Sequence, residues 1–340
     1  MSQCRATRSW IHAAAYYGWA LLIGLVTCKL FLGLHAPNWP DLADATWGVV
    51  EGHPRSTAFQ SRLLGPHAVA GLSALGWAPE SALRRFHVAG ILGLFLLLAR
   101  LLHLRGVAPG SALRHLATFA LAFLGLQFYW FHTWDTLDLL VFSVLAYGIF
   151  ARKPVRFFLV LYPLALLNRE SGLFVAVYIA LEGLEFDAAR RRVRLVAPWR
   201  LWSGLALLAL GIAWTAVARS TLIVATPEVS TGAPAFALGN ELHVWANLRN
   251  LLWANFRGLQ AVHSVFVIGV FASFALRAGR FTDAQLKAFL LALALFANIL
   301  VFGIVVETRV FFVLLPLLLF LWVDLEPADR TPRAPAPPAA

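Results

Sequence analysis

The chain has 340 residues, of which 60% are hydrophobic and 13% are charged, and its formal net charge is +11. A soluble domain has about 45–50% apolar and about 25% charged residues, so no soluble fold would bury this much apolar surface. The mean hydropathy of +0.73 predicts a membrane protein. Its apolar runs are long and do not alternate with polar residues, which predicts helices and excludes a β-barrel.

The first apolar run, 13–34, follows Arg5 and Arg8. It is too long for the core of a signal peptide, so we interpret it as a retained first span. Because a span needs about 20 apolar residues, the full set of candidate spans is 13–34, 86–104, 115–131, 136–151, 155–167, 172–184, 199–221, 259–276, 286–306 and 309–324.

The expected fold is therefore an all-α, polytopic transmembrane helix bundle with about ten spans, forming a single domain over 1–326. The short runs 155–167 and 172–184 are compatible with two short spans, a broken helix or a re-entrant pair. The run 63–78 contains glycines, a proline and a histidine, so we expect an interfacial helix within the first outer loop, 35–85. The Pro- and Ala-rich end, 327–340, is predicted to be a disordered tail.

Charge sorting predicts the topology. With the N-terminus in the cytoplasm, most of the 28 Lys and Arg residues fall in the inner segments, as the positive-inside rule requires. The mixed polar clusters then all fall on the outer face. They are 40–62, 131–138, 168–171, 226–257 and 307–309.

Ionisable residues at membrane depth cost roughly 2.5–3.5 kcal/mol each and mark functional sites by default. Arg169–Glu170 and Glu307–Arg309 read as two such pairs, with the alternative that Glu170 meets another arginine, and Arg62 lies next to Gly65-Pro66. Arginine binds phosphate bidentately, so these clusters indicate a shared anion site. The alternative reading is a turn whose arginines snorkel to lipid headgroups. On the first reading, Arg169→Ala should abolish activity and leave expression nearly intact.

Carboxylates on the same face are candidates for acid–base chemistry. Asp41 and Asp44 in the first outer loop are candidate general bases, or simply solvated loop residues. Asp135 reads as a helix cap, whereas Asp138 lies one turn further in and is a candidate site residue. The histidines show no metal-ligand spacing, so no cofactor is predicted and a divalent metal is not supported by spacing.

The segment 242–258 reads as an amphipathic helix in a second outer loop, 226–258, with Arg249 and Arg257 among its apolar residues. It would either form one wall of a lipid-facing cleft or simply lie on the membrane surface.

The layout, together with FQSRLLGP (59–66), LNRESG (167–172) and VETRVFFVLLP (306–316), resembles the GT-C superfamily of integral-membrane glycosyltransferases. The resemblance implies a sugar donor carried on a polyprenyl phosphate and transfer on the outer face. Asp44 or Asp41 would match the acid that serves as base in the first loop, although here the two are spaced D-L-A-D. Arg62, Arg169 and Arg309 would be candidates for binding the lipid phosphate.

Other functions compete with this one. A lipid-linked polysaccharide polymerase or ligase would rely on Arg249 and Arg257 in the second outer loop. A transporter or flippase for a lipid-linked or anionic substrate, or a non-enzymatic assembly subunit, would also fit a charged membrane bundle. Membrane lipid and a lipid-linked sugar are the expected partners. Nucleic acid is not, because the basic residues lie between spans. The expected location is a bacterial plasma membrane.

Overall fold

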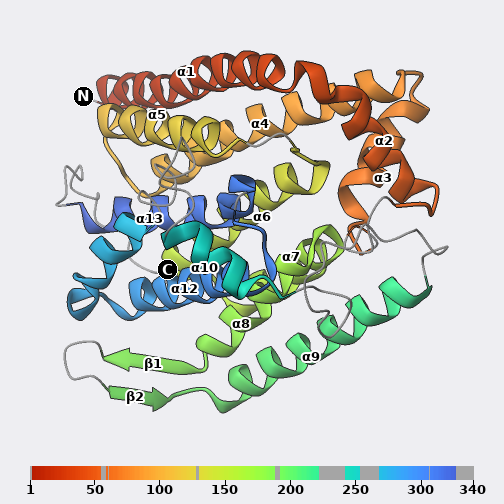
Figure 1. The fold of residues 1–340 in the computed structure, drawn as a ribbon. Helices are drawn as coiled ribbons and strands as arrows, with labels where there is room; N and C mark the ends of the chain where they lie inside the picture. Colours follow the sequence, from red (N-terminus) through yellow and green to blue (C-terminus); the bar gives the residue numbers. More distant parts are fainter. Residues whose placement is uncertain are drawn as a thin grey trace.

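The computed structural model describes residues 2–54, 59, 61–127, 130–187, 192–221, 242–252, 268–305 and 307–326. It is a helical bundle (Figure 1). On one side α1 (Ser2–Leu34) packs along α4 (Pro79–Leu104) and α5 (Pro109–Gly125). In the middle α6 (Thr133–Phe150) packs against α4 and against α13 (Leu315–Leu325), which continues the 3-10 helix η7 (Thr308–Leu314).

The other side of the bundle contains α7 (Val155–Asn168), the 3-10 turn η3 (Glu170–Gly172) and α8 (Leu173–Leu181). There α8 packs along α9 (Pro198–Thr221) and also contacts α12 (Asp283–Phe302). Close packing of α8 on α9 depends on Gly204, because a Cβ there would lie 2.4 Å from the backbone nitrogen of Ala180. Because glycine has no side chain, the two helices approach closely here, as they do at small residues in other membrane bundles.

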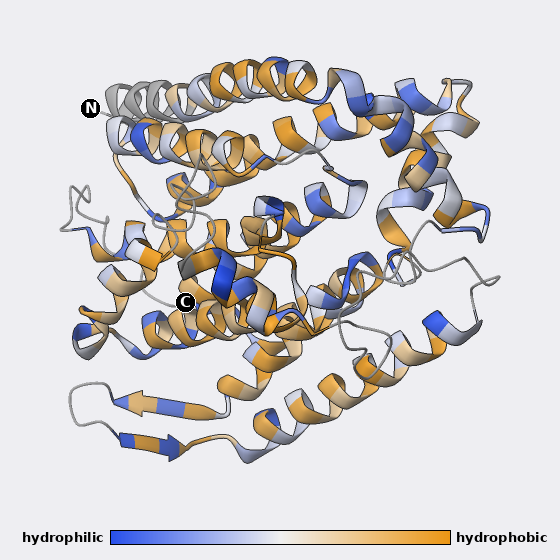
Figure 2. Ribbon diagram, viewed as in Figure 1, coloured by the Kyte–Doolittle hydropathy of each residue, from blue (hydrophilic) through white to orange (hydrophobic). Residues whose placement is uncertain are grey.

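Within the residues that the structure describes, six helices are long and apolar enough to cross a membrane: Ala14–Leu34, Pro79–Leu104, Thr133–Phe150, Pro198–Thr221, Asp283–Phe302 and Thr308–Leu325. The hydrophobic colouring runs along these helices in Figure 2. The span of α9 is 22% buried and that of α1 is 28% buried, whereas those of α6 and α13 are each 78% buried. Thus α6 and α13 form the centre, and α1 and α9 present apolar side chains outward, where lipid would cover them.

The expected helical membrane bundle is confirmed, but the figure of ten spans is not. The runs 155–167 and 172–184 form the shorter helices α7 and α8, and 115–131 corresponds to the 17-residue α5. Much of 259–276 lies outside the described residues. The run 63–78 forms α3 (Leu64–Ala74), whose 11 residues cover only about 16 Å, too short for a hydrocarbon core of about 30 Å. That α3 lies on the membrane surface stays a prediction.

The remaining elements connect the spans. A 3-10 turn, η1 (Ala36–Asn38), leads from α1 into α2 (Trp39–Val50). The basic segment after α8 forms an antiparallel β-hairpin of β1 (Leu184–Asp187) and β2 (Arg192–Leu195), which was not expected from the sequence. Leu184 pairs with Leu195 in its register. A further 3-10 turn, η6 (Ala278–Arg280), precedes α12. A capping box starts α12: Thr282 Oγ1 accepts from Gln285 N, and Gln285 Oε1 accepts from Thr282 N at 2.8 Å.

The short helix α10 (Val244–Leu252) covers part of the predicted amphipathic segment, and the rest of 226–258 lies outside the described residues. Asn247 anchors it to the chain that follows α12: its Nδ2 donates to Gly303 O at 2.6 Å, and Val305 N donates to its Oδ1 at 3.0 Å. Trp245 on this helix is 83% exposed. Arg249 is also exposed, and neither residue contributes to the cavity described below.

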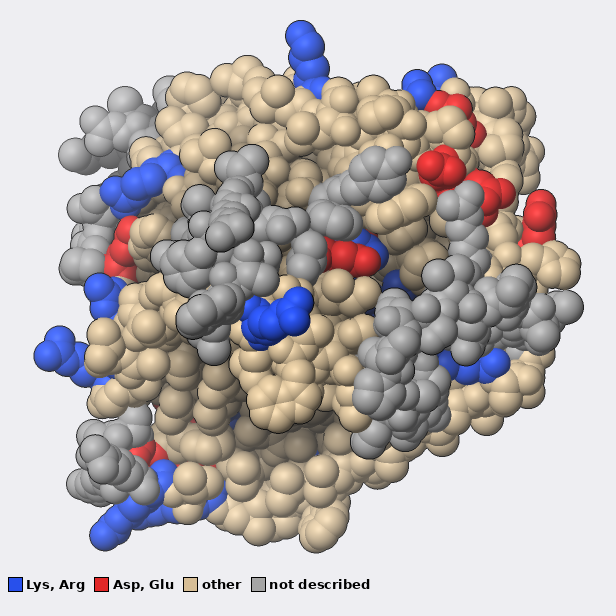
Figure 3. Space-filling view, in the orientation of Figure 1, with Lys and Arg blue, Asp and Glu red and all other residues tan. Residues whose placement is uncertain are grey.

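The two ends of the bundle carry separate polar networks. At one end, Arg105 pairs with Asp324, and Lys287 pairs with Glu182 at 3.4 Å. At the end where α2 and α3 lie in Figure 1, the loop before α3 meets the α7–α8 break and the end of α9. In Figure 3, acidic side chains gather toward that same end, at upper right. The expected outer clusters that the structure describes therefore share one end, and which compartment that end faces stays a prediction.

Candidate functional site

The break between α7 and α8 positions the two charged residues of the segment 168–171, Arg169 and Glu170. The helix ends at Asn168, and Arg169 takes extended dihedrals of φ −166° and ψ 158° before the chain turns through η3. Gly172 closes the turn, because a Cβ there would lie 2.4 Å from the carbonyl carbon of Ala165. Since Arg169 is extended and Glu170 is helical, the two neighbouring side chains enter different networks.

The first network is built around Asp135, in the first turn of α6. Asp135 is 1% exposed and bridges two arginines: Arg169 Nη1 donates to its Oδ1 at 3.0 Å, and Arg309 Nη1 donates to its Oδ2 at 3.0 Å. The backbone N–H of His132 donates to Oδ2 at 2.9 Å, which completes a capping interaction. A carboxylate this deeply buried requires such partners, so Asp135 joins α6, the α7–α8 break and η7.

Asp138 lies one turn further along α6 and is also 1% exposed. Asn168 Nδ2 donates to Asp138 Oδ1 at 2.8 Å, Ser171 Oγ lies 3.2 Å from both carboxylate oxygens, and Arg169 Nη1 lies 3.4 Å from Oδ2. Arg169 thus pairs with two aspartates of α6, whereas Glu170 meets other arginines, which is the alternative that the sequence left open. The predicted pair of Arg309 with Glu307 is confirmed at 2.6 Å.

The second network is built around Glu170. Ser61 Oγ donates to Glu170 Oε1 at 2.6 Å, Arg219 Nη2 donates to the same oxygen at 2.8 Å, and Arg62 Nε lies 3.5 Å from Oε2. A backbone hydrogen bond of 2.9 Å from Leu63 N to Leu167 O fixes the loop before α3 against the end of α7. Glu170 therefore joins three segments that are far apart in the sequence.

Arg62 is 8% exposed, and its guanidinium lies over the rings of Trp134 (4.9 Å) and Phe59 (5.2 Å). Burial lowers the pKa of Arg62 to about 10, with the Glu170 carboxylate opposing this and the Arg169 and Arg309 charges adding to it. Arg62 remains protonated at neutral pH. A buried cation with one carboxylate at 3.5 Å is placed to accept a second anionic partner.

A cavity of about 380 Å³ opens beside these networks. Its polar wall contains Arg62, Arg169, Glu170, Ser171, Thr215, Arg219 and Asn298. Its apolar wall comes from α8, α9, α12 and η7 and consists of Leu173, Phe174, Ile212, Leu295, Ile299, Phe302, Val310 and Val313.

The charges are balanced in the networks but not on the cavity wall. Four arginines (Arg62, Arg169, Arg219, Arg309) meet four carboxylates (Asp135, Asp138, Glu170, Glu307) in the networks. The wall itself has three of the arginines and only one of the carboxylates, Glu170, so its formal charge is 3 − 1 = +2. This surplus on the wall favours an anion, although Asp135 and Asp138 behind Arg169 offset part of it.

The sequence-predicted site residues divide into three groups. Arg62, Arg169 and Glu170 line the cavity. Asp138, Glu307 and Arg309 do not line it but support the Asp135 network. The candidate bases Asp41 and Asp44 lie on α2, half-buried and exposed respectively, and neither lines the cavity.

Sequence reasoning missed several participants, among them Ser61, Arg219, Asp135 and Asn168. Arg219 resembles an ordinary flanking charge at the end of a span, Asp135 resembles a helix cap, and Asn168 had no separate signal. A signal was available for Asp135, since its spacing from Asp138 puts both carboxylates on one helix face. Among the residues that the structure describes, no group of three or more His, Cys, Asp or Glu side chains is placed to hold a metal ion.

The arrangement is suited to binding an anion and not, by itself, to proton transfer. The carboxylate on the cavity wall, Glu170, is engaged by two arginines and a serine hydroxyl. Such partners stabilise its charged form and make it a weak base. Comparison with known proteins gave no matching family model, no similar curated protein and no similar solved structure.

Proposed function

We propose that the cavity at the α7–α8 break binds the phosphate of a lipid-linked substrate. The observation that carries the proposal is the formal charge of +2 on a wall that is otherwise mostly apolar. A ligand with an anionic head and a hydrocarbon chain matches both parts of the wall. A small hydrophilic anion would match only the arginines.

The reaction we propose is glycosyl transfer from a polyprenyl-phosphate sugar to an acceptor at the outer face of the membrane. Breaking the bond between sugar and phosphate leaves additional negative charge on the phosphate. Cations fixed beside the phosphate oxygen that leaves the sugar favour the transition state over the ground state. Glu170 holds Arg62 and Arg219 in place. Asp135 and Asp138 hold Arg169. The three arginines therefore need little reorganisation during the reaction.

The base in this scheme is Asp44 or Asp41 on α2. Both lie outside the cavity wall, so the proposal requires the sugar of the bound donor to extend from the cavity toward α2, at the same end of the bundle (Figure 1). An acceptor hydroxyl held there would lose its proton as it attacks the sugar.

Transport is a second candidate, favoured by a cavity of about 510 Å³ at the opposite end of the bundle. Charged residues on its wall include Arg152, Lys153, Glu182, Arg200, Asp283 and Lys287. Charged residues inside a membrane bundle mark substrate and ion pathways, and a charged cavity near each end is compatible with such a pathway. A radiolabelled lipid-linked sugar in proteoliposomes distinguishes the two functions: transport moves the label across the bilayer unchanged, and transfer places it on a new product.

Mass spectrometry of co-purified lipid tests the proposed ligand. The protein is purified in mild detergent as wild type, as Arg62→Gln, and as Arg100→Gln, an exposed arginine of α4 outside the cavity wall. We expect polyprenyl phosphate or its glycoside in the wild type and in Arg100→Gln, and about tenfold less in Arg62→Gln, the loss that corresponds to one charge-assisted hydrogen bond. Only bulk phospholipid in all three samples would overturn the proposal.

A further inference from the structure

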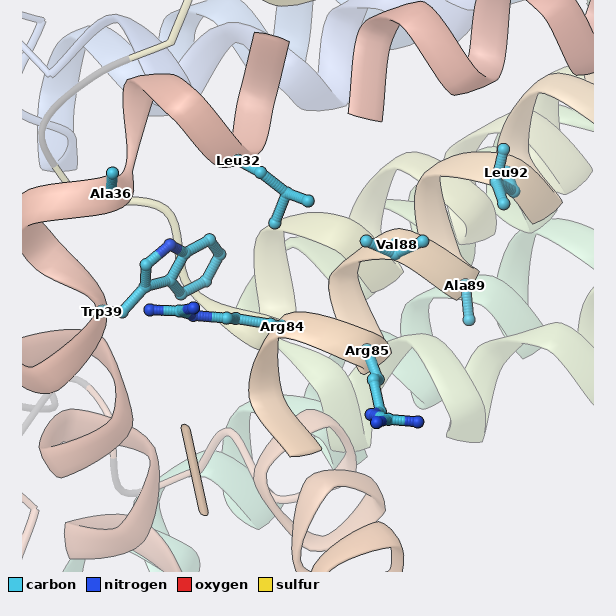
Figure 4. Close-up of a pocket in the computed structure, with 8 residues that line it drawn as sticks. All are labelled: Leu32, Ala36, Trp39, Arg84, Arg85, Val88, Ala89 and Leu92. Carbon is cyan, nitrogen blue, oxygen red and sulfur yellow. The ribbon is translucent and has the colours of Figure 1, made fainter. Parts of the chain in front are cut away.

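A groove of about 500 Å³ lies on another part of the molecule, between the end of α1, the start of α2 and the first turns of α4. Leu32, Val88, Ala89 and Leu92 form its apolar part (Figure 4). Trp39 and Arg84 lie together at one end, with the Arg84 guanidinium 5.5 Å from the Trp39 ring centroid, and the neighbouring Arg85 points away from Trp39 (Figure 4). None of the residues on its wall lines the cavity of Arg62, Arg169 and Arg219 described above, here called the arginine cavity.

The groove runs from the start of a span toward its interior. The step from Arg85 to Leu92 along α4 covers about 10 Å at 1.5 Å per residue. Tryptophans mark the headgroup level of membrane proteins; Trp39 lies beside Arg84, and Trp77 lies beside Arg85. Leu30 and Leu34 of the neighbouring α1 are 50% and 55% exposed, as expected for a helix that faces lipid. The arginines thus lie at headgroup depth and the leucines at acyl-chain depth.

The mouth of the groove has a surplus of positive charge. Arg84 is paired with Glu80 one turn earlier on α4. Arg85 lies over the Trp77 ring at 4.3 Å and makes no ion pair within the described residues. The three charges sum to +1, and the guanidinium of Arg85 has hydrogen-bond donors for a phosphate.

We propose that this groove binds an anionic phospholipid of the surrounding bilayer, with one acyl chain along Leu32, Val88 and Leu92 and the phosphate on Arg85. The charge at the mouth selects an anionic headgroup over a zwitterionic one. The apolar part, open beside the lipid-facing surface of α1, selects a chain already in the bilayer over a free phosphate. The inference does not depend on the function proposed for the arginine cavity.

Native mass spectrometry in mild detergent tests this assignment, with phosphatidylglycerol or phosphatidylcholine titrated into the delipidated protein. Two variants address the two parts of the groove: Arg85→Ala removes the charge, and Ala89→Phe fills the apolar channel. Arg100→Ala is the matched control, an exposed arginine elsewhere on α4. Thermal unfolding in the same detergent verifies that each variant is folded.

We expect phosphatidylglycerol to bind about fivefold more weakly to Arg85→Ala, the effect of one basic residue at a membrane surface. Ala89→Phe should weaken both lipids, and Arg100→Ala should match the wild type. Equal affinity of the wild type for the two lipids, equal losses in Arg85→Ala and Arg100→Ala, or no effect of Ala89→Phe would overturn the proposal. A dimer that dissociates in Ala89→Phe would also overturn it, by assigning the groove to a second copy of the chain.

Discussion

Arg309 and Asp135 are 174 positions apart in the sequence, and Arg309 Nη1 donates to Asp135 Oδ2 over 3.0 Å at a site where both side chains are buried. The contact joins the last described span to the central helix α6. Because Asp135 also accepts from Arg169, one carboxylate links three parts of the bundle.

Removing one partner of this network should destabilise the fold. Arg309→Ala leaves Asp135 with a single arginine, and Arg169→Ala leaves two buried aspartates without their shared cation. We expect each to lower the free energy of unfolding by about 3–5 kcal/mol, as for other broken buried pairs. Denaturant titration in detergent measures this loss. For Arg169 this replaces the expectation from sequence that expression stays intact.

The control for that experiment is Arg84→Ala, which breaks an exposed pair with Glu80 and should cost about 0–1 kcal/mol. Arg309→Ala combined with Asp135→Ala should be less destabilising than the sum of the two single changes, since the double variant buries no lone charge. Additive effects would show that the two residues do not interact in the folded protein.

Gly172→Ala should impair folding through backbone crowding. Its Cβ would lie 2.4 Å from the carbonyl carbon of Ala165, which is backbone and cannot rotate away. Overpacking of this kind costs about 1–3 kcal/mol. Gly18→Ala on α1, where the added Cβ meets nothing within 4 Å, is the matched control. Thermal unfolding in detergent should show a lower midpoint for Gly172→Ala alone, and equal midpoints would refute the crowding argument.

Glu170→Gln should strengthen the binding of an anionic ligand in the arginine cavity. The change raises the formal charge of the wall from +2 to +3 and preserves the shape of the side chain. Electrostatic attraction at a short distance then favours the ligand by about three- to tenfold in affinity. Titration of a short-chain polyprenyl phosphate by isothermal calorimetry measures this. Weaker binding would mean that Glu170 acts chiefly by holding Arg62 and Arg219 in place.

Asp44→Asn tests the proposed base. If Asp44 accepts the proton of the acceptor, turnover should fall by about 10²–10⁴-fold, and binding of the donor should stay unchanged because Asp44 does not line the cavity. Asp41→Asn provides the comparison on the same helix. Normal turnover in both variants would exclude α2 as the source of the base.

Sequence patterns predicted a membrane protein, its helical character and most of the charged residues that take part in the two networks. Each of these depends on local composition. They did not predict pairing. Adjacent Arg169 and Glu170 were read as partners, but an extended residue followed by a 3-10 turn sends their side chains to different helices. Arg219 and Asp135 have local explanations, as a flanking charge and a cap. Their contacts arise only when distant segments pack, and no single stretch of sequence records that.

The link between Asp135 and Arg309 also bears on how the protein is made. Synthesis proceeds from the N-terminus, so α6 and Arg169 leave the ribosome well before Arg309. Until the final segment is inserted, the carboxylate of Asp135 has one of its two cations. An unfinished or truncated chain therefore contains a buried carboxylate with half of its cationic partners, and we expect it to be less stable than the complete bundle.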